Sequence, residues 1–371
     1  MAARATRSAS GSSDSSDSSD SSEGSPSTLG GAANLPSWQL SHPAVAARAT
    51  AELYARRCFV DAMQKRTMPR SSSDADSRCL LLALSHDELD VIVDGLADPL
   101  QPIVAVAFSS TCKGLRTPLG PALEVLQERH ARAVALCRKM EMSCVQLHFA
   151  AKLQTEKTAT GHTACGKGLT AYELATLGMI LRTNGLPWLQ RLYLNSNGFG
   201  DAGMQALFEG LGRGAAPSLL QLLLADNKIG LVGAEALAAA LGRGAMPKLA
   251  QLILAANPIG NQGMAALAAP LRKLPELYEL YLLSCGIGDE GMVSLVDNLG
   301  KDDFRALTGL FLHTNKITDA GMSTLGAALE AGGLPRLRNG PDFTEVFLKI
   351  NPASASAIQA VKDALAKRSS L

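Results

Sequence analysis

LQRLYLNSN, the stretch at residues 189–197, decides the fold of this chain because its pattern of leucines and asparagine recurs along the sequence. Leucines hold its first, fourth and sixth positions, and asparagine holds its ninth. Two copies keep all of these positions: LLQLLLADN at 219–227 and LAQLILAAN at 249–257. Three more keep the frame with substitutions: LYELYLLSC at 277–285, LTGLFLHTN at 307–315 and FTEVFLKIN at 343–351. The ninth positions lie 28 to 36 residues apart, which indicates a repeat architecture.

A second pattern follows each copy and predicts a helix. Glycine lies six residues after the ninth position in five copies, and leucine lies ten residues after it. The glycines are Gly203, Gly233, Gly263, Gly291 and Gly321, and the leucines are Leu207, Leu237, Leu267, Leu295 and Leu325. In the last copy Ala357 replaces the glycine while Val361 and Leu365 keep the helix frame, as expected where an array ends. Each unit is therefore predicted to be a strand, a turn and a helix.

An earlier, degenerate copy can be aligned on the same spacing. Its predicted strand residues are Cys144, Leu147 and Phe149, and its predicted turn and helix residues are Leu169, Leu177 and Leu181. The alignment requires an insert of about 15 residues between Lys152 and Lys167. About seven units are thus predicted over residues 141–371.

The repeat string resembles the ribonuclease-inhibitor type of leucine-rich repeat over roughly residues 144–366. The resemblance implies an α/β solenoid in the shape of a horseshoe, with a parallel sheet on the concave face and helices outside. It also implies that the residue at the ninth position is buried and bonds the backbone of adjacent turns. The residues of this asparagine ladder are Asn197, Asn227, Asn257, Cys285, Asn315 and Asn351, where cysteine is an accepted alternative to asparagine.

The strand pattern also predicts a row of side chains on the concave face. Because strand side chains alternate, the residue between the two inner leucines points away from the core. That residue is apolar or aromatic in every copy: Tyr193, Leu223, Ile253, Tyr281, Phe311 and Phe347. Exposed apolar stripes mark binding surfaces, so we predict that this row binds a partner. The alternatives are that repeats tolerate such residues there, or that a tail of this chain covers them.

The positions beside this row are mixed in charge. They are Arg191, Gln221, Gln251, Glu279, Gly309 and Glu345 on one side, and Asn195, Ala225, Ala255, Leu283, His313 and Lys349 on the other. The whole chain has a net charge of +1, from 35 lysines and arginines against 34 acidic residues. Nucleic acid would favour a basic stripe. The predicted ligand is therefore a protein or peptide, and neither nucleic acid nor a membrane is expected as a partner.

Residues 80–140 are predicted to form a helical block. Four apolar residues share one face of its first helix: Leu84, Leu89, Ile92 and Leu96. A second apolar segment runs from Leu100 to Phe108, and a third, longer helix is predicted from Pro121 to Met140.

This block resembles an F-box, the adaptor-binding module of cullin-type ubiquitin ligases. Besides the first helix, the resemblance includes TCKGLR at 111–116, where the family has a Cys-Lys/Arg-x-Trp-Arg type of string. The chain departs from the family at Ser85, where proline is usual, and at Leu115, where tryptophan is frequent. The resemblance assigns adaptor binding to Leu84, Leu89, Ile92, Leu96, Cys112 and Leu115. The alternative is that these residues form the core of a helical cap on the repeats.

The first 79 residues differ from the rest. Residues 1–36 are rich in serine and aspartate with little to bury, so we predict a disordered tail, followed by a helix and linker over 37–79. The seven cysteines are odd in number and lack CxxC spacing, which is typical of free thiols in a reducing compartment. Since no apolar signal or membrane segment is found, we expect a cytoplasmic or nuclear protein.

No catalytic residue, metal or cofactor is predicted. GHTACGKG at 161–168 nearly matches a phosphate-binding loop, but Gly168 stands where a magnesium-binding hydroxyl is needed. His162 and Cys165 offer two ligands at one short spacing, whereas structural zinc takes four. The serines and histidines form no nucleophile motif such as G-x-S-x-G.

The sequence therefore predicts a non-enzymatic recognition protein. The leading hypothesis is an F-box-type substrate receptor of a cullin ubiquitin ligase, which needs no catalytic residue of its own. One alternative is a leucine-rich-repeat scaffold. Another is a GTPase-activating regulator of the Ran type, which the same repeats also resemble. That family normally ends in an acidic tail, whereas this sequence ends with Lys367 and Arg368 near its last residue.

Overall fold

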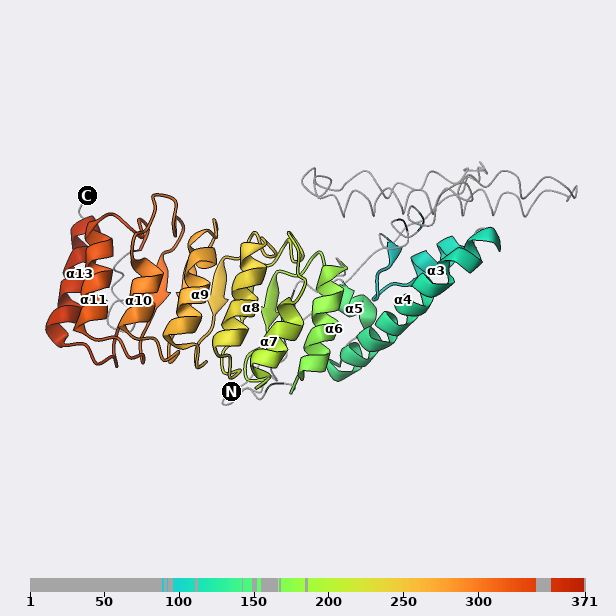
Figure 1. Cartoon of the computed structure of the whole chain (residues 1–371), viewed down its shortest axis with the longest axis horizontal. Coiled ribbons are helices and arrows are strands. Elements are labelled where there is room, and N and C mark those ends of the chain that lie inside the picture. The colour runs from blue at the N-terminus through green and yellow to red at the C-terminus, as the bar shows by residue number, and fades with distance from the viewer. Residues whose placement is uncertain are drawn as a thin grey trace, which may run out of the picture.

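The structure, a computed structural model, describes residues 89, 92, 96–110, 113–141, 143–148, 152–154, 166, 168–183, 186–337 and 348–369. The predicted tail over 1–36 and the predicted helix and linker over 37–79 lie outside these residues. From residue 152 onward the described chain forms an elongated array in which helices lie side by side (Figure 1). None of the described helices is long and apolar enough to cross a membrane.

Short parallel strands form one sheet in chain order. The described strands are β1 Lys152–Gln154, β2 Arg191–Tyr193, β3 Gln221–Leu223, β4 Gln251–Ile253, β5 Glu279–Tyr281 and β6 Gly309–Phe311. In the middle of each strand from β2 onward, one repeat leucine pairs with the equivalent leucine of the next strand, as Leu222 does with Leu252. The predicted strand frame of these repeats is confirmed.

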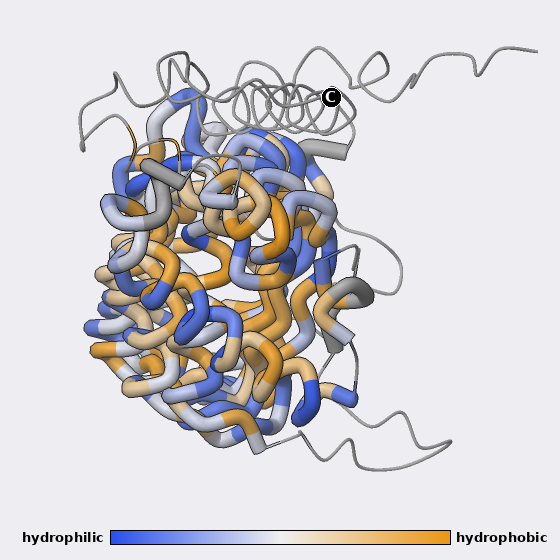
Figure 2. The backbone as a smooth tube through the Cα atoms, turned by 90° about the vertical axis from the view of Figure 1, so that its right-hand side faces the viewer, coloured by the Kyte–Doolittle hydropathy of each residue, from blue (hydrophilic) through white to orange (hydrophobic). Residues whose placement is uncertain are grey.

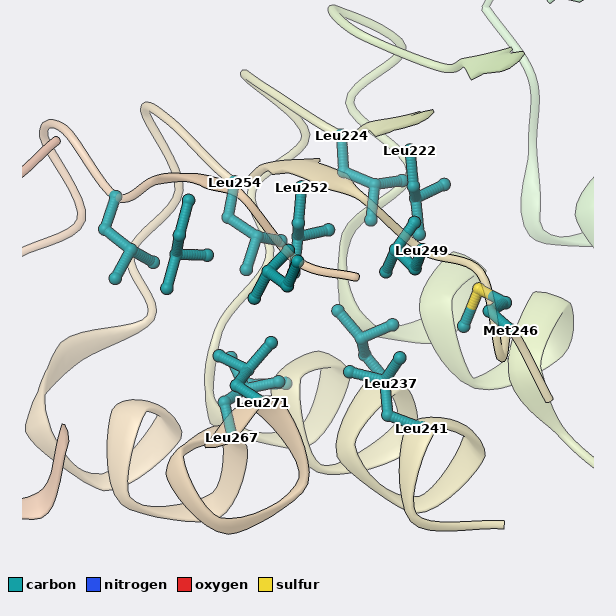
Figure 3. Packing of buried hydrophobic residues seen from close by; sticks show 14 of the residues in the cluster. Leu222, Leu224, Leu237, Leu241, Met246, Leu249, Leu252, Leu254, Leu267 and Leu271 are labelled. Atoms are coloured by element: carbon teal, nitrogen blue, oxygen red, sulfur yellow. The ribbon is translucent and has the colours of Figure 1, made fainter. Parts of the chain in front are cut away.

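A helix returns the chain from each strand to the next. The described helices of the array are α6 Ala171–Arg182, α7 Gly200–Phe208, α8 Leu231–Gly242, α9 Gly260–Arg272, α10 Asp289–Val296, α11 Asp319–Glu330 and α13 Ala355–Ser369. The core lies between the sheet and these helices, where Leu222 and Leu252 face Leu237 and Leu267 (Figure 3). Viewed along the array, hydrophobic residues gather toward the inside of the coil (Figure 2). Stacked units thus bury one continuous core that no single unit could bury alone.

Glycine six residues after the ninth position allows neighbouring helices to approach. At Gly233, a Cβ atom would lie 2.6 Å from the Asp201 Oδ1 atom and 2.8 Å from the Ile229 Cγ2 atom. Both distances are shorter than real Cβ contacts, so any larger residue would push the start of α8 away from α7. This close approach explains why glycine recurs at this point of the repeat.

The first unit differs from its prediction. Residues Cys144–His148 form a short helix, α5, and the strand is β1, in which Leu153 pairs with Leu192. The prediction that Cys144 and Leu147 belong to a strand is therefore wrong, while Phe149 lies outside the described residues. Apolar residues three apart fit the strand frame and a helical turn equally well, and here Leu147 is buried as part of a helix. Leu169, Leu177 and Leu181 are buried in the turn and in α6, as predicted.

Before the array lies the helical block. Its described helices are α3 Ile103–Ser110 and α4 Lys113–Lys139. The third helix thus begins at Lys113 rather than at Pro121, and it contains both Pro118 and Pro121. Proline removes one helical hydrogen bond, but Pro121 lies on the exposed side of α4, where water can bond the carbonyl that it leaves unpaired.

The two halves of α4 belong to different cores. Leu119 and Leu126 pack with Leu89, Leu96 and Phe108 in a small separate cluster. Farther along, Ala133, Leu136, Cys137 and Met140 join the core of the repeats. The Lys139 ammonium also donates to the Glu173 carboxylate of α6 at 2.9 Å. The helix α4 therefore attaches the helical block to the first repeat.

The end of the array is closed by α13, which packs on α11. Val361 and Leu365 of α13 are buried, which confirms the predicted helix frame. The predicted strand residues Phe343, Val346 and Phe347 lie outside the described residues.

Candidate protein-binding face

The candidate site is the face of the sheet that points away from the helices. The sheet row, as we name it, contains Tyr193, Leu223, Ile253, Tyr281 and Phe311. Strand pairing puts each of these residues beside the next, in register from β2 to β6. Their strand neighbours Leu192, Leu222, Leu252, Leu280 and Leu310 are buried on the helix side. The sixth predicted member, Phe347, lies outside the described residues.

Exposure varies along the sheet row. Tyr193, Leu223, Ile253 and Tyr281 are half-buried, so each keeps part of its side chain open to solvent. Phe311 is buried, with 9% of its surface exposed. Its ring stacks on Tyr281, with the ring centroids 3.8 Å apart and the planes 12° from parallel. The prediction that Phe311 is an open contact residue is therefore wrong, because its neighbours cover it.

Gly309 provides the space for this ring. A Cβ atom on Gly309 would lie 3.0 Å from the Phe311 Cε2 atom and 3.2 Å from the Glu279 Cγ atom. Because glycine has no side chain, the ring can lean over β6 toward Tyr281. A position predicted only to flank the row thus decides how far Phe311 is buried.

Polar side chains hold the aromatic residues in place. The Tyr193 hydroxyl donates to the Gln221 Oε1 atom at 2.8 Å. The Glu279 carboxylate accepts from the Gln251 amide at 2.5 Å and from the Tyr281 hydroxyl at 3.3 Å. Burial, together with the negative charge of Glu279, raises the pKa of Tyr281 to about 12. The phenol therefore stays neutral at physiological pH, and both tyrosines are pre-oriented.

The positions beside the sheet row carry little net charge. Arg191 and Lys349 are exposed at opposite corners, whereas Gly309 and Ala255 are buried. The half-buried positions between them are Gln221, Gln251, Glu279, Asn195, Ala225, Leu283 and His313. Glu345 lies outside the described residues. The face is thus apolar along its middle and polar but nearly neutral at its edges.

Beneath this face the asparagine ladder ties each turn to the next. Asn227 has no exposed surface, and its Oδ1 atom accepts from the backbone N–H groups of Asn197 and Gly198 at 2.9 and 3.0 Å. Its Nδ2 atom donates to the carbonyls of Leu194, Leu224 and Ala225. One side chain therefore satisfies five backbone groups in two adjacent turns.

The equivalent atoms recur along the array. Asn257 and Asn315 are buried and make the same contacts with the preceding turn, whereas Asn197 and Asn351 make them at the two ends while half-buried. Cys285 donates its thiol to the Leu254 carbonyl at 3.3 Å, and burial raises its pKa to about 12. Cysteine has no amide oxygen to accept from the Ile259 N–H group, which donates to the Asn257 carbonyl instead. Cysteine thus supplies the ladder's donor, and among the described residues its sulfur accepts from the Asn257 N–H group alone.

A second ladder, not predicted from the sequence, joins the starts of the helices. The Asp289 carboxylate accepts from the Thr318 N–H group at 2.8 Å, the Thr318 hydroxyl at 2.6 Å and the Gly321 N–H group at 3.0 Å. Burial of this carboxyl opposes ionisation, but these hydrogen bonds outweigh it and lower its pKa. Asp201, Asn261 and Asp319 do the same work in their repeats. Their regular position, four residues after the ninth position, is the signal that would have revealed them.

In the helical block, the predicted adaptor-binding residues differ in burial, and some of them lie outside the described residues. Leu89 and Leu96 are buried in its small core, and Ile92 is half-buried against it. Leu84, Cys112 and the Leu115 side chain lie outside the described residues. Two other apolar residues, Ile103 and Val106, lie one turn apart on α3 and are 74% and 50% exposed.

The glycine-rich stretch at 161–168 is described only at Gly166 and Gly168. The Gly166 N–H group donates to the Ser196 carbonyl, and the Gly168 carbonyl accepts from Lys139. Both glycines thus bond other parts of the chain. Within the described residues, no three histidine, cysteine, aspartate or glutamate side chains gather as a metal site would require.

The fold and the ladder define a leucine-rich-repeat protein. A family model described as Leucine Rich repeat matches residues 185–208, 215–238 and 277–296. These segments cover the strands and helices of three of the units, including β2 with α7 and β3 with most of α8. No curated protein matches the chain. Repeats of this family are typical of modules that bind other proteins.

Proposed function

We propose that this chain is a protein-recognition module that holds its partner on the sheet row. The observation that carries the proposal is the unbroken register of apolar or aromatic residues across adjacent strands, four of which keep part of their side chain open to solvent. Tyrosine and branched aliphatic side chains on rigid strands lose little conformational entropy on binding and exclude water well.

The edges of the row favour a protein over other ligands. Glutamine, asparagine and alanine surround its apolar middle, with Arg191 and Lys349 as exposed cations and Glu279 as a half-buried anion. An apolar centre with a polar rim is the usual anatomy of a protein interface. Nucleic acid would require a basic stripe, which these residues do not form.

The more specific proposal is that of an F-box-type substrate receptor, whose partner on the sheet row is the substrate. The helical block supports it in two ways: it has its own small core, and it exposes Ile103 and Val106 beside each other on α3. An exposed apolar pair on such a block suits an adaptor. The predicted adaptor contacts Leu89 and Leu96 would then support this surface from inside.

Purification of the tagged full-length chain, followed by mass spectrometry, tests both the recognition proposal and the receptor proposal. Three variants are compared: Leu223→Gln with Ile253→Gln on the sheet row, Ile103→Gln with Val106→Gln on α3, and Val232→Gln as the control. Val232 is apolar and 40% exposed, but it lies on α8 at the opposite side of the array. Circular dichroism establishes that each variant folds.

The recognition proposal requires one or more partners that the sheet-row variant loses and the Val232→Gln variant keeps. The receptor proposal also requires a cullin and its adaptor, both lost from the α3 variant alone. A Ran-like GTPase as the main partner would favour the GTPase regulator instead. Several partners without ubiquitin-ligase components would favour a scaffold.

A further inference from the structure

A hollow of about 370 Å³ lies between α4 and α6, where the helical block meets the first repeat. From α4 it is lined by Val125, Glu128, Arg129 and Arg132, and from the end of α6 by Met179, Arg182 and Thr183. Three arginines and one glutamate therefore line the hollow. No ion pair joins Glu128 to any of these arginines within the part of the chain that the structure describes.

Two of the three guanidinium groups are held in place. Arg132 lies over the ring of Tyr172, 5.0 Å from its centroid. Arg182 donates from Nη1 to the Glu209 carbonyl at 2.8 Å. A guanidinium held over an aromatic ring by a cation–π contact still has N–H groups that can bond the oxygens of an anion.

One of these donors is buried and unused. The Nε atom of Arg132 is shielded from solvent and has no hydrogen-bond partner among the described residues. A buried donor without a partner is costly, and native structures usually satisfy it. Because this donor lies beneath the surface of the hollow, an oxyanion bound there would contact the terminal Nη groups of Arg132, and Nε would bond it only after the side chain turns.

We propose that this hollow binds a phosphate monoester. A phosphate dianion has three terminal oxygens and can accept from several guanidinium groups at once, which a single carboxylate does less well. Val125 and Met179 provide apolar surface for the organic group that carries the phosphate. This group is either a phosphorylated side chain of a partner protein or a small metabolite, and both present the same chemistry. The site lies on α4 and α6, so it does not depend on binding at the sheet row.

The test measures binding by calorimetry to the full-length chain. The probes are a short phosphoserine peptide, the same peptide without phosphate, glucose 6-phosphate and inorganic phosphate. The key variants are Arg132→Gln and Arg129→Gln, and Arg305→Gln is the control because Arg305 is exposed elsewhere on the array. Arg129→Gln keeps the stack of Arg132 on Tyr172, so it remains informative if Arg132→Gln folds poorly.

We expect a phosphate ester to bind with a dissociation constant below about 1 mM and the unphosphorylated peptide not to bind. Arg132→Gln and Arg129→Gln should each weaken binding about tenfold or more, and Arg305→Gln should not change it. Tighter binding of the peptide than of the sugar phosphate assigns the site to a protein partner, and the reverse assigns it to a metabolite. The proposal is overturned if no phosphate probe binds, or if the Arg129→Gln variant binds as the wild type does.

Discussion

The ring of Tyr281 lies flat on the ring of Phe311, 3.8 Å away, although the two residues belong to different strands. Register puts them beside each other on β5 and β6, and Gly309 leaves the space into which Phe311 leans. Tyr281 thus lies at the surface, whereas Phe311 belongs to the packed interior. A change at either residue therefore affects stability as well as binding.

We expect Phe311→Ala to lower the free energy of unfolding by about 3 kcal/mol, because it removes a buried ring and half of the stack. Tyr281→Phe, the control, keeps the stack and loses a hydroxyl hydrogen bond, so it should cost no more than about 1 kcal/mol. Urea unfolding followed by circular dichroism measures both. Equal stability of Phe311→Ala and wild type would mean that the ring is not packed as described.

Two glycines of α11 should respond in opposite directions to alanine. At Gly321 a Cβ atom would clash with the Asp289 carboxylate and with Ile317, whereas at Gly326 nothing lies within 4 Å. Gly321→Ala should therefore be destabilising, by about 1 to 3 kcal/mol. Gly326→Ala should stabilise by about 0.5 to 1 kcal/mol, because alanine restricts the unfolded chain and favours the helix. Thermal unfolding measures the stability of both variants. A stability change of the same sign in the two variants would contradict the helix contacts.

The asparagine ladder offers a similar comparison within one chain. Asn227→Ala leaves two N–H groups and several carbonyls unsatisfied, so the unfolding free energy should fall by about 2 to 3 kcal/mol. Cys285→Ala removes only a weak thiol donor at the equivalent position and should cost less than half as much. If urea unfolding showed equal losses, backbone satisfaction would not be what the ladder contributes.

Much of the array can be predicted from the sequence because its signals recur. Leucines such as Leu222 and Leu252 repeat at fixed spacing, which predicts the strand frame and the register of the sheet row. The burial of Phe311 has no such signal, since alternation gives only the direction of a side chain and not what its neighbours cover. The hollow between α4 and α6 joins residues roughly 50 positions apart, such as Arg132 and Arg182, and no repeat pattern relates them.

The strand of the first unit cannot be predicted from the sequence, because the repeat spacing is interrupted there. Cys144 and Leu147 fit the strand frame, but without a ninth-position asparagine nothing in the sequence distinguishes a strand there from a turn of helix. β1 follows at Lys152–Gln154 instead. The ladder at Asp289 and Asp319 could be predicted from the sequence, because its residues recur four positions after the ninth position of the repeat. Comparing each position of the repeat between copies reveals them.

Acid should weaken the attachment of α4 to the first repeat. Burial of the Glu173 carboxyl opposes ionisation, but hydrogen bonds from Thr170 and the Lys139 ion pair outweigh it and lower its pKa to about 2. A lowered pKa stabilises the folded state above the ordinary value near 4.5, and the contribution is lost as pH falls toward 2. At pH 7, Glu173→Gln should therefore be less stable than wild type by about 1 kcal/mol, which is less than the pKa shift alone implies because solvent screens this carboxylate.

Urea unfolding at several pH values between 7 and 2 measures this difference. The gap between wild type and Glu173→Gln should close as the pH approaches 2, whereas Glu330→Gln, an exposed control, should follow wild type throughout. A gap that stays constant with pH would mean that the charge of Glu173 contributes nothing to folding.

Photo-crosslinking tests the claim that the sheet row holds the partner most directly. A photoreactive amino acid replaces Ile253 on the sheet row in one protein and Val232 on α8 in another, and each is irradiated with the partner identified by purification. We expect a crosslinked adduct at position 253 and none at position 232, because only position 253 would lie within the interface. Crosslinking at position 232 with none at 253 would contradict the claim and move the interface to the helices.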